Sequence, residues 1–317
     1  MAMSSSVFGI VCLLLFALSQ GVRDALFGNI FQSVSFLFIA TLAFGLSCVV
    51  FFLFALLRRP KDLVMLARAP GALVMLNVTT AIAWLGFLYG LRDLEPAVVA
   101  TFYNGVGPLV ALVAGLYGWS DGQRHVSLPE MACYAGLAAT LVALAALVLT
   151  GYSGMALDST TRQAVALAAV AGGGAMITVS YIVTLWFADE GVGSDAVMSA
   201  RFPLTLAIAA AWEFTIGGAG PRPAAEAVPM FAVAAFALIV LPSFLVQLGV
   251  SRTSPLTANV LRALGPVCVF AVQQLDGRLT FSGATLACIA AFCFFAIAAS
   301  FLRGWSDTRA EASVSKL

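Results

Sequence analysis

Long stretches without a charged side chain constrain the fold of this chain more than any other feature of its sequence. A helix needs about 20 largely uncharged residues to cross a hydrocarbon core of about 30 Å. Of the 317 residues, 62% are hydrophobic and 10% are charged, whereas about 25% are charged in a typical soluble domain. The chain is therefore expected to be an integral membrane protein. Eight uncharged stretches are candidate spans: residues 1–22, 25–57, 69–91, 96–120, 131–157, 163–188, 227–251 and 279–302.

Two further segments are candidate spans if each accommodates an internal charge. Residues 196–217 contain Arg201 and Glu213, and residues 255–275 contain Arg262. We therefore expect an all-α protein with ten transmembrane helices. The first run, residues 1–22, has no basic segment ahead of its apolar residues, so it is predicted to be a retained helix and not a cleaved signal peptide.

Lysine and arginine are unevenly distributed among the connecting segments, and cytoplasmic loops of membrane proteins retain positive charge. With both termini in the cytoplasm, nine of these residues lie inside and four outside. This difference predicts a multi-pass protein with cytoplasmic N and C termini. The net charge of +1 gives no indication of a nucleic-acid partner. The inside set is Arg58, Arg59, Lys61, Arg68, Arg124, Arg252, Arg303, Arg309 and Lys316, and the outside set is Arg92, Arg162, Arg222 and Arg278.

Short sequence matches indicate an internal repeat. Residues 90–96 and residues 249–255 each begin with Gly, end with Pro and link two predicted spans, and Gly107–Pro108 then corresponds to Gly265–Pro266. Five spans per copy would insert the second copy upside down, as in many transporters. The alternative is that Gly and Pro matches arise by chance in apolar sequence. The predicted organisation is a first five-helix repeat over 1–157, a second, inverted repeat over 158–305, and a cytoplasmic tail over 306–317.

Together with the Arg201–Phe202 opening of the seventh span, these features resemble the drug/metabolite transporter superfamily, in particular its bacterial EamA-type exporters. The closest resemblance is to exporters of aromatic amino acids. The resemblance implies ten helices around a central cavity, alternating access, and a place in the bacterial inner membrane. The chain departs from the pattern at Phe16–Ala17–Leu18–Ser19, where relatives often carry Trp-Gly-Ser, and at Ser35–Phe36, where they often carry Arg-Phe.

Polar side chains inside a membrane are candidate site residues because they are costly in hydrocarbon. Thr101, Asn104 and Pro108 lie on one face of the fourth span. Asn259, Arg262 and Pro266 have the same spacing in the ninth span. We expect these two stripes to face each other near the pseudo-twofold axis and to bind substrate, with Arg262 holding a carboxylate. The alternative is that the amide and guanidinium groups only bond to neighbouring helices.

Trp84 lies well inside the third span, away from the membrane interfaces where tryptophan usually gathers. It shares a helical face with Asn77, and the fourth, sixth and eighth spans offer further aromatic and amide groups. Such a cavity suits an apolar or aromatic solute with a polar end, although plain aromatic packing is the alternative. The further residues predicted to line it are Tyr103, Tyr181 and Gln247.

Four residues are candidates for gating. Pro108 and Pro266 each remove a backbone hydrogen bond and can kink a helix, although both could be passive bends. Ser19 and Arg23, next to Asp24, either form an outer gate or mark the point where the first helix leaves the membrane. We favour the second interpretation. The glycines of the third and sixth spans, Gly86, Gly90 and Gly172–Gly174, are predicted to allow close helix packing.

Every acidic residue is predicted to lie in a loop, a tail or a span end, which disfavours a carboxylate proton relay. We therefore expect facilitative transport. An intramembrane enzyme would need a base or a metal in the spans, so the chain is not expected to be an enzyme. The six cysteines form no Cys-x-x-Cys pair, and no metal site or cofactor is predicted.

The sequence thus predicts a membrane transporter that exports amino acids, aromatic or otherwise apolar ones, or similar small metabolites. Its expected partners are that solute and the lipid bilayer, with the oligomeric state left open. One alternative is a nucleotide-sugar or phosphorylated-metabolite exchanger, which would require several converging basic residues such as Arg262, Arg23 and Arg201. Another is a membrane scaffold or sensor that transports nothing.

Overall fold

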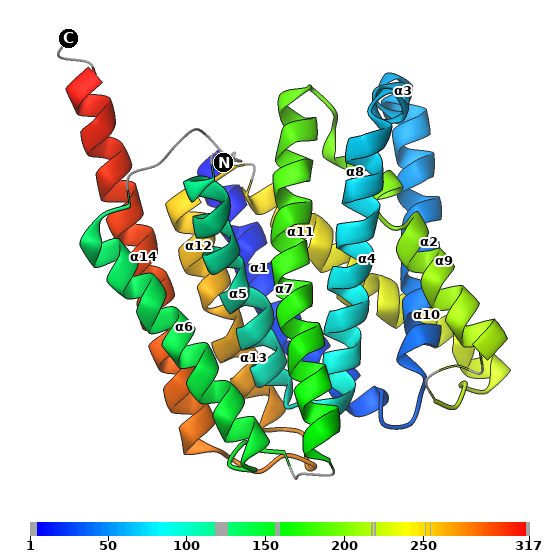
Figure 1. The fold of residues 1–317 in the computed structure, drawn as a ribbon. Coiled ribbons are helices and arrows are strands. Elements are labelled where there is room, and N and C mark those ends of the chain that lie inside the picture. The colour runs from blue at the N-terminus through cyan, green and yellow to red at the C-terminus, as the bar shows by residue number, and fades with distance from the viewer. Residues whose placement is uncertain are drawn as a thin grey trace.

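The structure is a computed structural model that describes residues 5–117, 126–155, 159–216, 218, 220–250, 252–253 and 255–314. These residues form helices and no β-strand. Figure 1 shows the helices gathered in one bundle, with the start of the first helix and the end of the last at the same end. The helices are α1 (Ser5–Ile30), α2 (Phe36–Arg58), α3 (Pro60–Arg68), α4 (Pro70–Asp93), α5 (Pro96–Leu116), α6 (Leu128–Leu149), α7 (Thr160–Asp189), α8 (Ser194–Ala200), α9 (Pro203–Ala211), η1 (Trp212–Ile216), η2 (Ala225–Ala227), α10 (Val228–Ala235), η3 (Phe236–Val240), α11 (Leu241–Val250), α12 (Pro255–Ala263), α13 (Gly265–Gln273) and α14 (Gly283–Val314).

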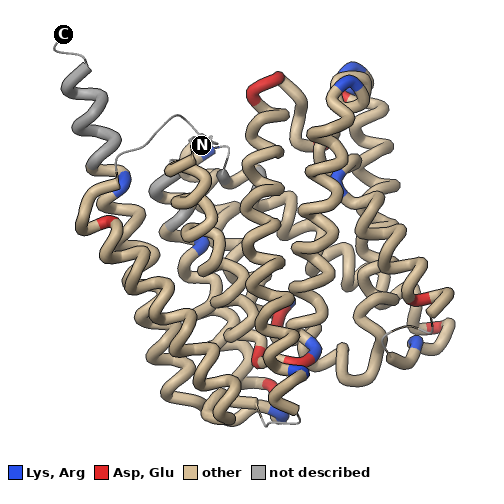
Figure 2. The backbone as a smooth tube through the Cα atoms, viewed as in Figure 1, with Lys and Arg blue, Asp and Glu red and all other residues tan. Residues whose placement is uncertain are grey.

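Among the described residues, eight helices are long and apolar enough to cross a membrane. Their length and composition fit a multi-pass helical membrane protein, as the sequence predicted. Figure 2 shows most charged residues near the two ends of the bundle, with a largely uncharged middle. The eight segments are Ser6–Ile30, Phe36–Arg58, Pro70–Asp93, Pro96–Leu116, Leu128–Leu149, Thr160–Asp189, Ala225–Val246 and Gly283–Trp305.

Helix starts follow the local sequence. Ser35, Ser127 and Ser159 are the N-cap residues of α2, α6 and α7, and each side chain accepts a hydrogen bond from a backbone N–H in the first turn. Proline occupies the first turn of α4 and α5, where the missing N–H has no intrahelical partner to lose.

Helix α1 is longer than predicted, and Arg23 and Asp24 lie inside it. The first span was predicted to end at Val22, but α1 continues to Ile30 and α2 begins at Phe36. Arg23 is 4% exposed and Asp24 is 0% exposed, so both side chains are covered by the bundle. Asp24 lies toward the C-terminal end of the apolar helix Ser6–Ile30. Burial is tolerated because the two side chains neutralise each other.

The segment predicted as the seventh span is interrupted. Helix α8 ends at Ala200 and α9 begins at Pro203, with Arg201 and Phe202 between them. The Asn77 side chain on α4 bridges this interruption: its Nδ2 donates to the Ala200 carbonyl at 2.7 Å, and its Oδ1 accepts from Leu204 N at 3.2 Å. The amide thus replaces bonds that an unbroken helix would make for itself.

The segment predicted as the ninth span is also interrupted, at Leu264 between α12 and α13. Pro266 lies in the first turn of α13. The Cys293 thiol of α14 donates to the free Ala263 carbonyl at 3.2 Å. Pro108, its predicted counterpart, lies inside the continuous helix α5. The two prolines therefore act differently, one in a helix break and the other within a helix.

Helices α4 and α7 pack at close range through Gly86 and Gly173, which confirms the close packing predicted for these two glycines, whereas a Cβ at Gly172 would meet no atom within 4 Å. A Cβ at Gly86 would lie 2.5 Å from the Ala169 carbonyl oxygen, and one at Gly173 would lie 2.9 Å from the Ala83 carbonyl oxygen. Only glycine permits this backbone approach.

Hydrogen bonds from several elements converge on Glu95 between α4 and α5, at the end of the bundle away from the termini. Its carboxylate is 1% exposed. It accepts from Gly154 N at 2.8 Å, Gln273 Nε2 at 2.6 Å and Thr285 Oγ1 at 3.3 Å. Burial raises the pKa of Glu95 above its ordinary value of 4.5, although these three hydrogen bonds oppose the effect. This network ties the α4–α5 link to α13 and α14.

The predicted boundary between the two halves, at residues 157 and 158, lies outside the described residues. The predicted tail over 306–317 begins inside helix α14, which continues to Val314.

Candidate functional site

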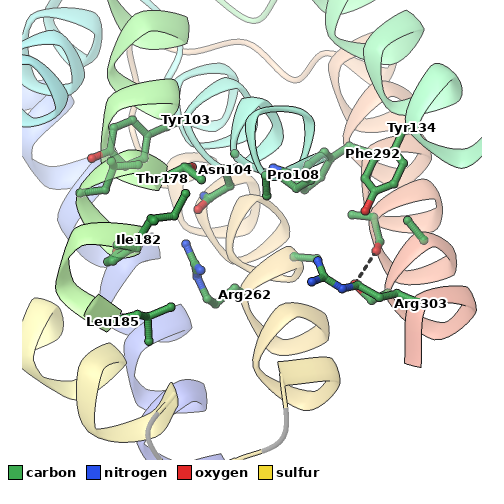
Figure 3. Close-up of a pocket in the computed structure, with 18 residues that line it drawn as sticks. Tyr103, Asn104, Pro108, Tyr134, Thr178, Ile182, Leu185, Arg262, Phe292 and Arg303 are labelled. Carbon is green, nitrogen blue, oxygen red and sulfur yellow. Dashed lines mark hydrogen bonds between the residues drawn. The ribbon is translucent and has the colours of Figure 1, made fainter. Parts of the chain in front are cut away.

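A cavity of about 250 Å³ lies between α5, α6, α7, α12 and α14. It extends from the middle of α5 toward the end of the bundle where α14 ends, and Figure 3 shows its wall. A smaller cavity of about 30 Å³ adjoins it, bounded also by α1, α4 and α11. Five residues line both spaces, so the two form one site with a wide and a narrow part. These five are Tyr103, Asn104, Ile177, Tyr181 and Arg262.

Arg262 on α12 is the central cation of this site. Its guanidinium carbon lies 5.2 Å from the centre of the Tyr181 ring, within the range of a cation–π interaction. Its Nε has no hydrogen-bond partner, and no carboxylate among the described residues forms an ion pair with it. A buried N–H without an acceptor is costly, and a ligand that accepts a hydrogen bond from Arg262 Nε would remove that cost.

Helix α5 contributes Tyr103 and Asn104 to the cavity wall. Asn104 Nδ2 donates to the Ala100 carbonyl at 2.8 Å, which leaves the side-chain oxygen as an acceptor. Pro108, one turn further along α5, also lines the wide part. Because proline has no N–H, the backbone carbonyl of Asn104 loses its intrahelical donor. Pro266 removes the corresponding donor from Arg262. Each proline therefore leaves the backbone without one N–H donor, four residues after a residue that lines the cavity.

The narrow part of the site is aromatic and contains Arg23. Trp84 lies edge-on to Phe87, with ring centres 5.9 Å apart, and both residues line this space. The Arg23 guanidinium lies 4.8 Å from the Phe87 ring centre, and its Nε donates to Asp24 Oδ1 at 2.6 Å. Arg23 therefore faces the cavity with its charge balanced by Asp24.

A third arginine stands behind the aromatic wall. Arg201 is 3% exposed and its Nη2 donates to the Ser180 hydroxyl at 2.9 Å. Ser180 also bonds to Thr80 at 2.9 Å. Arg201 lies within electrostatic range of Tyr103, but it lines neither part of the cavity.

Other predicted site residues lie elsewhere. Asn77 bridges the α8–α9 interruption, as described above. Thr101 is fully buried and its hydroxyl donates to the Ala97 carbonyl at 2.6 Å, and Ser19 donates to the Phe16 carbonyl at 2.8 Å. Neither lines the cavity. The side chains of Gln247 and Asn259 are outside the described part of the structure.

Several wall residues were not predicted. Arg303 was assigned only to an inner charged segment, yet its side chain reaches into the wide part of the cavity in Figure 3. Thr178 and Tyr134 also line it. Thr178 lies three residues before Tyr181 on α7, so helical spacing from a predicted site residue could have identified it. No comparable sequence signal marked Tyr134 or Arg303.

A scan of known protein families and a search of curated proteins both find no match to this chain. A solved structure, described only as "Crystal structure of protein", is similar to it with a TM-score of 0.63 and 18% sequence identity. The similarity covers 94% of this chain and 96% of that chain. At this identity the likeness is one of fold alone, and the whole helical bundle is an arrangement that a protein of known structure shares.

Proposed function

We propose that this chain is a membrane transporter for small organic solutes with a carboxylate and an apolar or aromatic body, such as amino acids or similar metabolites. The observation that carries the proposal is Arg262, which has no ion pair with a described carboxylate and lies beside an aromatic ring on a cavity wall inside a helical bundle. A guanidinium can hold a carboxylate through two parallel hydrogen bonds, and Tyr103 and Tyr181 offer aromatic faces for the solute body.

The size and charge of the cavity favour this class over nucleotide sugars or phosphorylated metabolites. Its volume of about 250 Å³ is slightly below the usual range of ligand pockets, about 300–1,000 Å³. Of the three arginines near Tyr103, Arg23 is neutralised by Asp24 and Arg201 bonds to Ser180 behind the wall. Among the described arginines, Arg262 and Arg303 line the wide part of the cavity, whereas a diphosphate is best held by several converging basic groups.

Helix contacts support two inverted five-helix repeats and ten spans, with α8–α9 and α12–α13 as the seventh and ninth. Helix α4 contacts α7 as α11 contacts α1, and α5 contacts α7 as α13 contacts α1. The contact between α4 and α9 likewise corresponds to that between α10 and α2. Alternating access would then be a rocking of two halves about the contact between α5 and α13.

This architecture agrees with the sequence resemblance to EamA-type exporters of the drug/metabolite transporter superfamily. The proposed location is the bacterial inner membrane, with both termini in the cytoplasm. In that orientation the wide part of the cavity faces the cytoplasm, where an exporter must first bind its solute.

Transport is proposed to be facilitative. Asp24 is the buried acidic residue that lies next to the narrow part of the cavity. Arg23 Nε lies 2.6 Å from Asp24 Oδ1, so this acidic residue already has a cationic partner within the protein. Abolishing the proton gradient across loaded proteoliposomes should leave efflux unchanged, and a loss of efflux would show that transport is proton-coupled.

Counterflow in proteoliposomes with labelled amino acids, amino-acid-derived acids and nucleotide sugars tests the function. We expect uptake of small carboxylates with apolar side chains. Arg262→Gln should reduce it at least about tenfold, because it removes a charge-assisted pair. The matched control is Arg252→Gln, since Arg252 is exposed and stacks on Phe8 outside the cavity. Absence of counterflow for every solute would favour a scaffold or sensor, and equal loss in both variants would contradict the role of Arg262.

A further inference from the structure

The charges on the wall of the wide cavity are all positive among the described residues. Arg262 on α12 and Arg303 on α14 both line it, and no aspartate or glutamate does. Figure 3 shows the two arginine side chains reaching into this space from different helices. Neither guanidinium forms an ion pair with a described carboxylate.

Two acidic groups among the described residues lie behind the residues that form the wall. Asp24 is paired with Arg23 next to the narrow part, and Glu130 lies behind Tyr134, whose hydroxyl donates to it at 3.5 Å. Both carboxylates belong to residues that are 0% exposed. They therefore cannot form a direct ion pair with a solute held in the cavity unless the wall itself rearranges.

An amino acid carries an ammonium group as well as a carboxylate. In this cavity the wall would favour the carboxylate and disfavour the ammonium. The described wall offers the ammonium only neutral acceptors, among them the side-chain oxygens of Asn104, Thr178 and Ser300. It would also lie in a space that contains two guanidinium groups. Removing an ammonium from water without a counter-ion, close to like charges, is unfavourable. The carboxylate has the opposite balance, because either arginine can pair with it.

We propose that the preferred solutes are organic anions of amino-acid size that carry a carboxylate on an apolar or aromatic body and no free ammonium group. Arylalkanoates, 2-oxo acids and N-acylated amino acids belong to this class. The proposal rests on the transport function proposed above and narrows its substrate class. Arg262 binds the carboxylate beside Tyr181, and Arg303, nearer the end of α14, adds to the positive potential of the same space and excludes cations.

Compounds with one phenyl skeleton and different charges test this selectivity in wild-type proteoliposomes. The set is 3-phenylpropionate, phenylpyruvate, N-acetylphenylalanine, phenylalanine and phenethylamine, with counterflow of labelled phenylpyruvate and of labelled phenylalanine measured in parallel. We expect each of the three anions to compete at least about tenfold more strongly than phenylalanine, as one charge-assisted interaction gained or lost implies. Phenethylamine should not compete.

Variants of Arg262 and Arg303 test whether these two residues cause the preference for anions. Arg303→Gln should reduce the ratio of anion to zwitterion competition while flux persists, and Arg262→Lys should retain more of the ratio than Arg262→Gln. Arg252→Gln, outside the cavity, should leave the ratio unchanged. The thermal shift that each compound produces in detergent gives a second reading of binding without flux.

The possible outcomes separate the two proposals. If phenylalanine is transported and competes as strongly as the anions or more strongly, the anion preference is wrong while the transport function stands. An anion preference that survives Arg303→Gln and Arg262→Gln unchanged would also overturn the assignment to these residues. If no compound is transported or shifts the unfolding temperature, the proposed function fails and this inference fails with it.

Discussion

Arg23 and Asp24 are neighbours in sequence and form an ion pair inside helix α1, with Arg23 Nε 2.6 Å from Asp24 Oδ1 and side chains that are 5% and 0% exposed. The guanidinium also lies over the rings of Phe87 and Trp84 on α4. One residue pair thus connects α1 to α4 beside the narrow part of the cavity. The pair allows two charged groups to occupy a position that hydropathy alone assigns to a helix end.

Removing only one member of this pair should destabilise the protein. Asp24→Asn leaves the Arg23 charge buried without a counter-ion, which costs about 3–5 kcal/mol. A double variant with Arg23→Met and Asp24→Leu should recover part of that loss, because neither charge remains. Apparent unfolding temperatures in detergent, arranged as a double-mutant cycle, measure the coupling. Equal stability of Asp24→Asn and the wild type would contradict the structural role of the pair.

Glu95 should make stability depend on pH. Because burial raises the pKa of its carboxyl in the folded protein, the neutral form is favoured there relative to the unfolded chain. Its contribution to stability is fully present below the ordinary value of 4.5 and is lost as the pH rises through the raised pKa. The unfolding temperature should therefore fall as the pH is raised from about 4 to about 8, and part of that fall should come from the ionisation of Glu95.

The matched variant for that measurement is Glu95→Gln, which has no titrating group at this position. We expect it to lower overall stability by about 1–3 kcal/mol, because an amide cannot accept from all three donors. The part of the pH slope due to Glu95 should disappear. A slope identical to that of the wild type would show that Glu95 does not titrate in this range.

Asn77 should matter for the helix interruption and not for solute selectivity. Asn77→Ala leaves the Ala200 carbonyl and Leu204 N–H without their side-chain partner, and an unsatisfied buried group costs about 1–3 kcal/mol. Hydrogen exchange should accelerate in peptides that cover α8 and α9 and stay unchanged in α6. The control is Asn29→Ala, at an exposed position of α1. A change in solute preference without faster exchange would instead indicate that Asn77 contacts the solute.

Glycine at position 86 should be required for the packing of α4 against α7. In Gly86→Ala the new Cβ would lie 2.5 Å from the Ala169 carbonyl oxygen, and such overpacking typically costs about 1–3 kcal/mol. Gly71→Ala in the same helix is the control, because a Cβ there meets no atom within 4 Å. Yield of monodisperse protein and unfolding temperature should fall for Gly86→Ala alone. If the two variants had the same yield and unfolding temperature, α4 and α7 could move apart without a loss of stability, and the requirement for glycine would be contradicted.

The cavity wall was only partly predictable. Tyr103, Asn104, Tyr181 and Arg262 were identified because polar and aromatic side chains deep in apolar helices are rare and costly. Arg303 was not, because a cation near the end of a span is what loop charge alone predicts. Its place on the wall depends on how α14 packs against α6 and α12.

The sequence by itself determined that the chain is helical, that it has long apolar segments and where most of them begin and end. In lipid each backbone N–H and carbonyl must be satisfied within its own helix, so composition and length suffice to locate such segments. Tertiary structure decided which side each polar residue faces. Asn77 bridges a helix break, Arg23 is buried against Asp24, and Arg262 lies on the cavity wall without an ion pair to any carboxylate that the structure describes. These outcomes depend on partners brought from distant parts of the chain, which no local pattern of hydropathy contains.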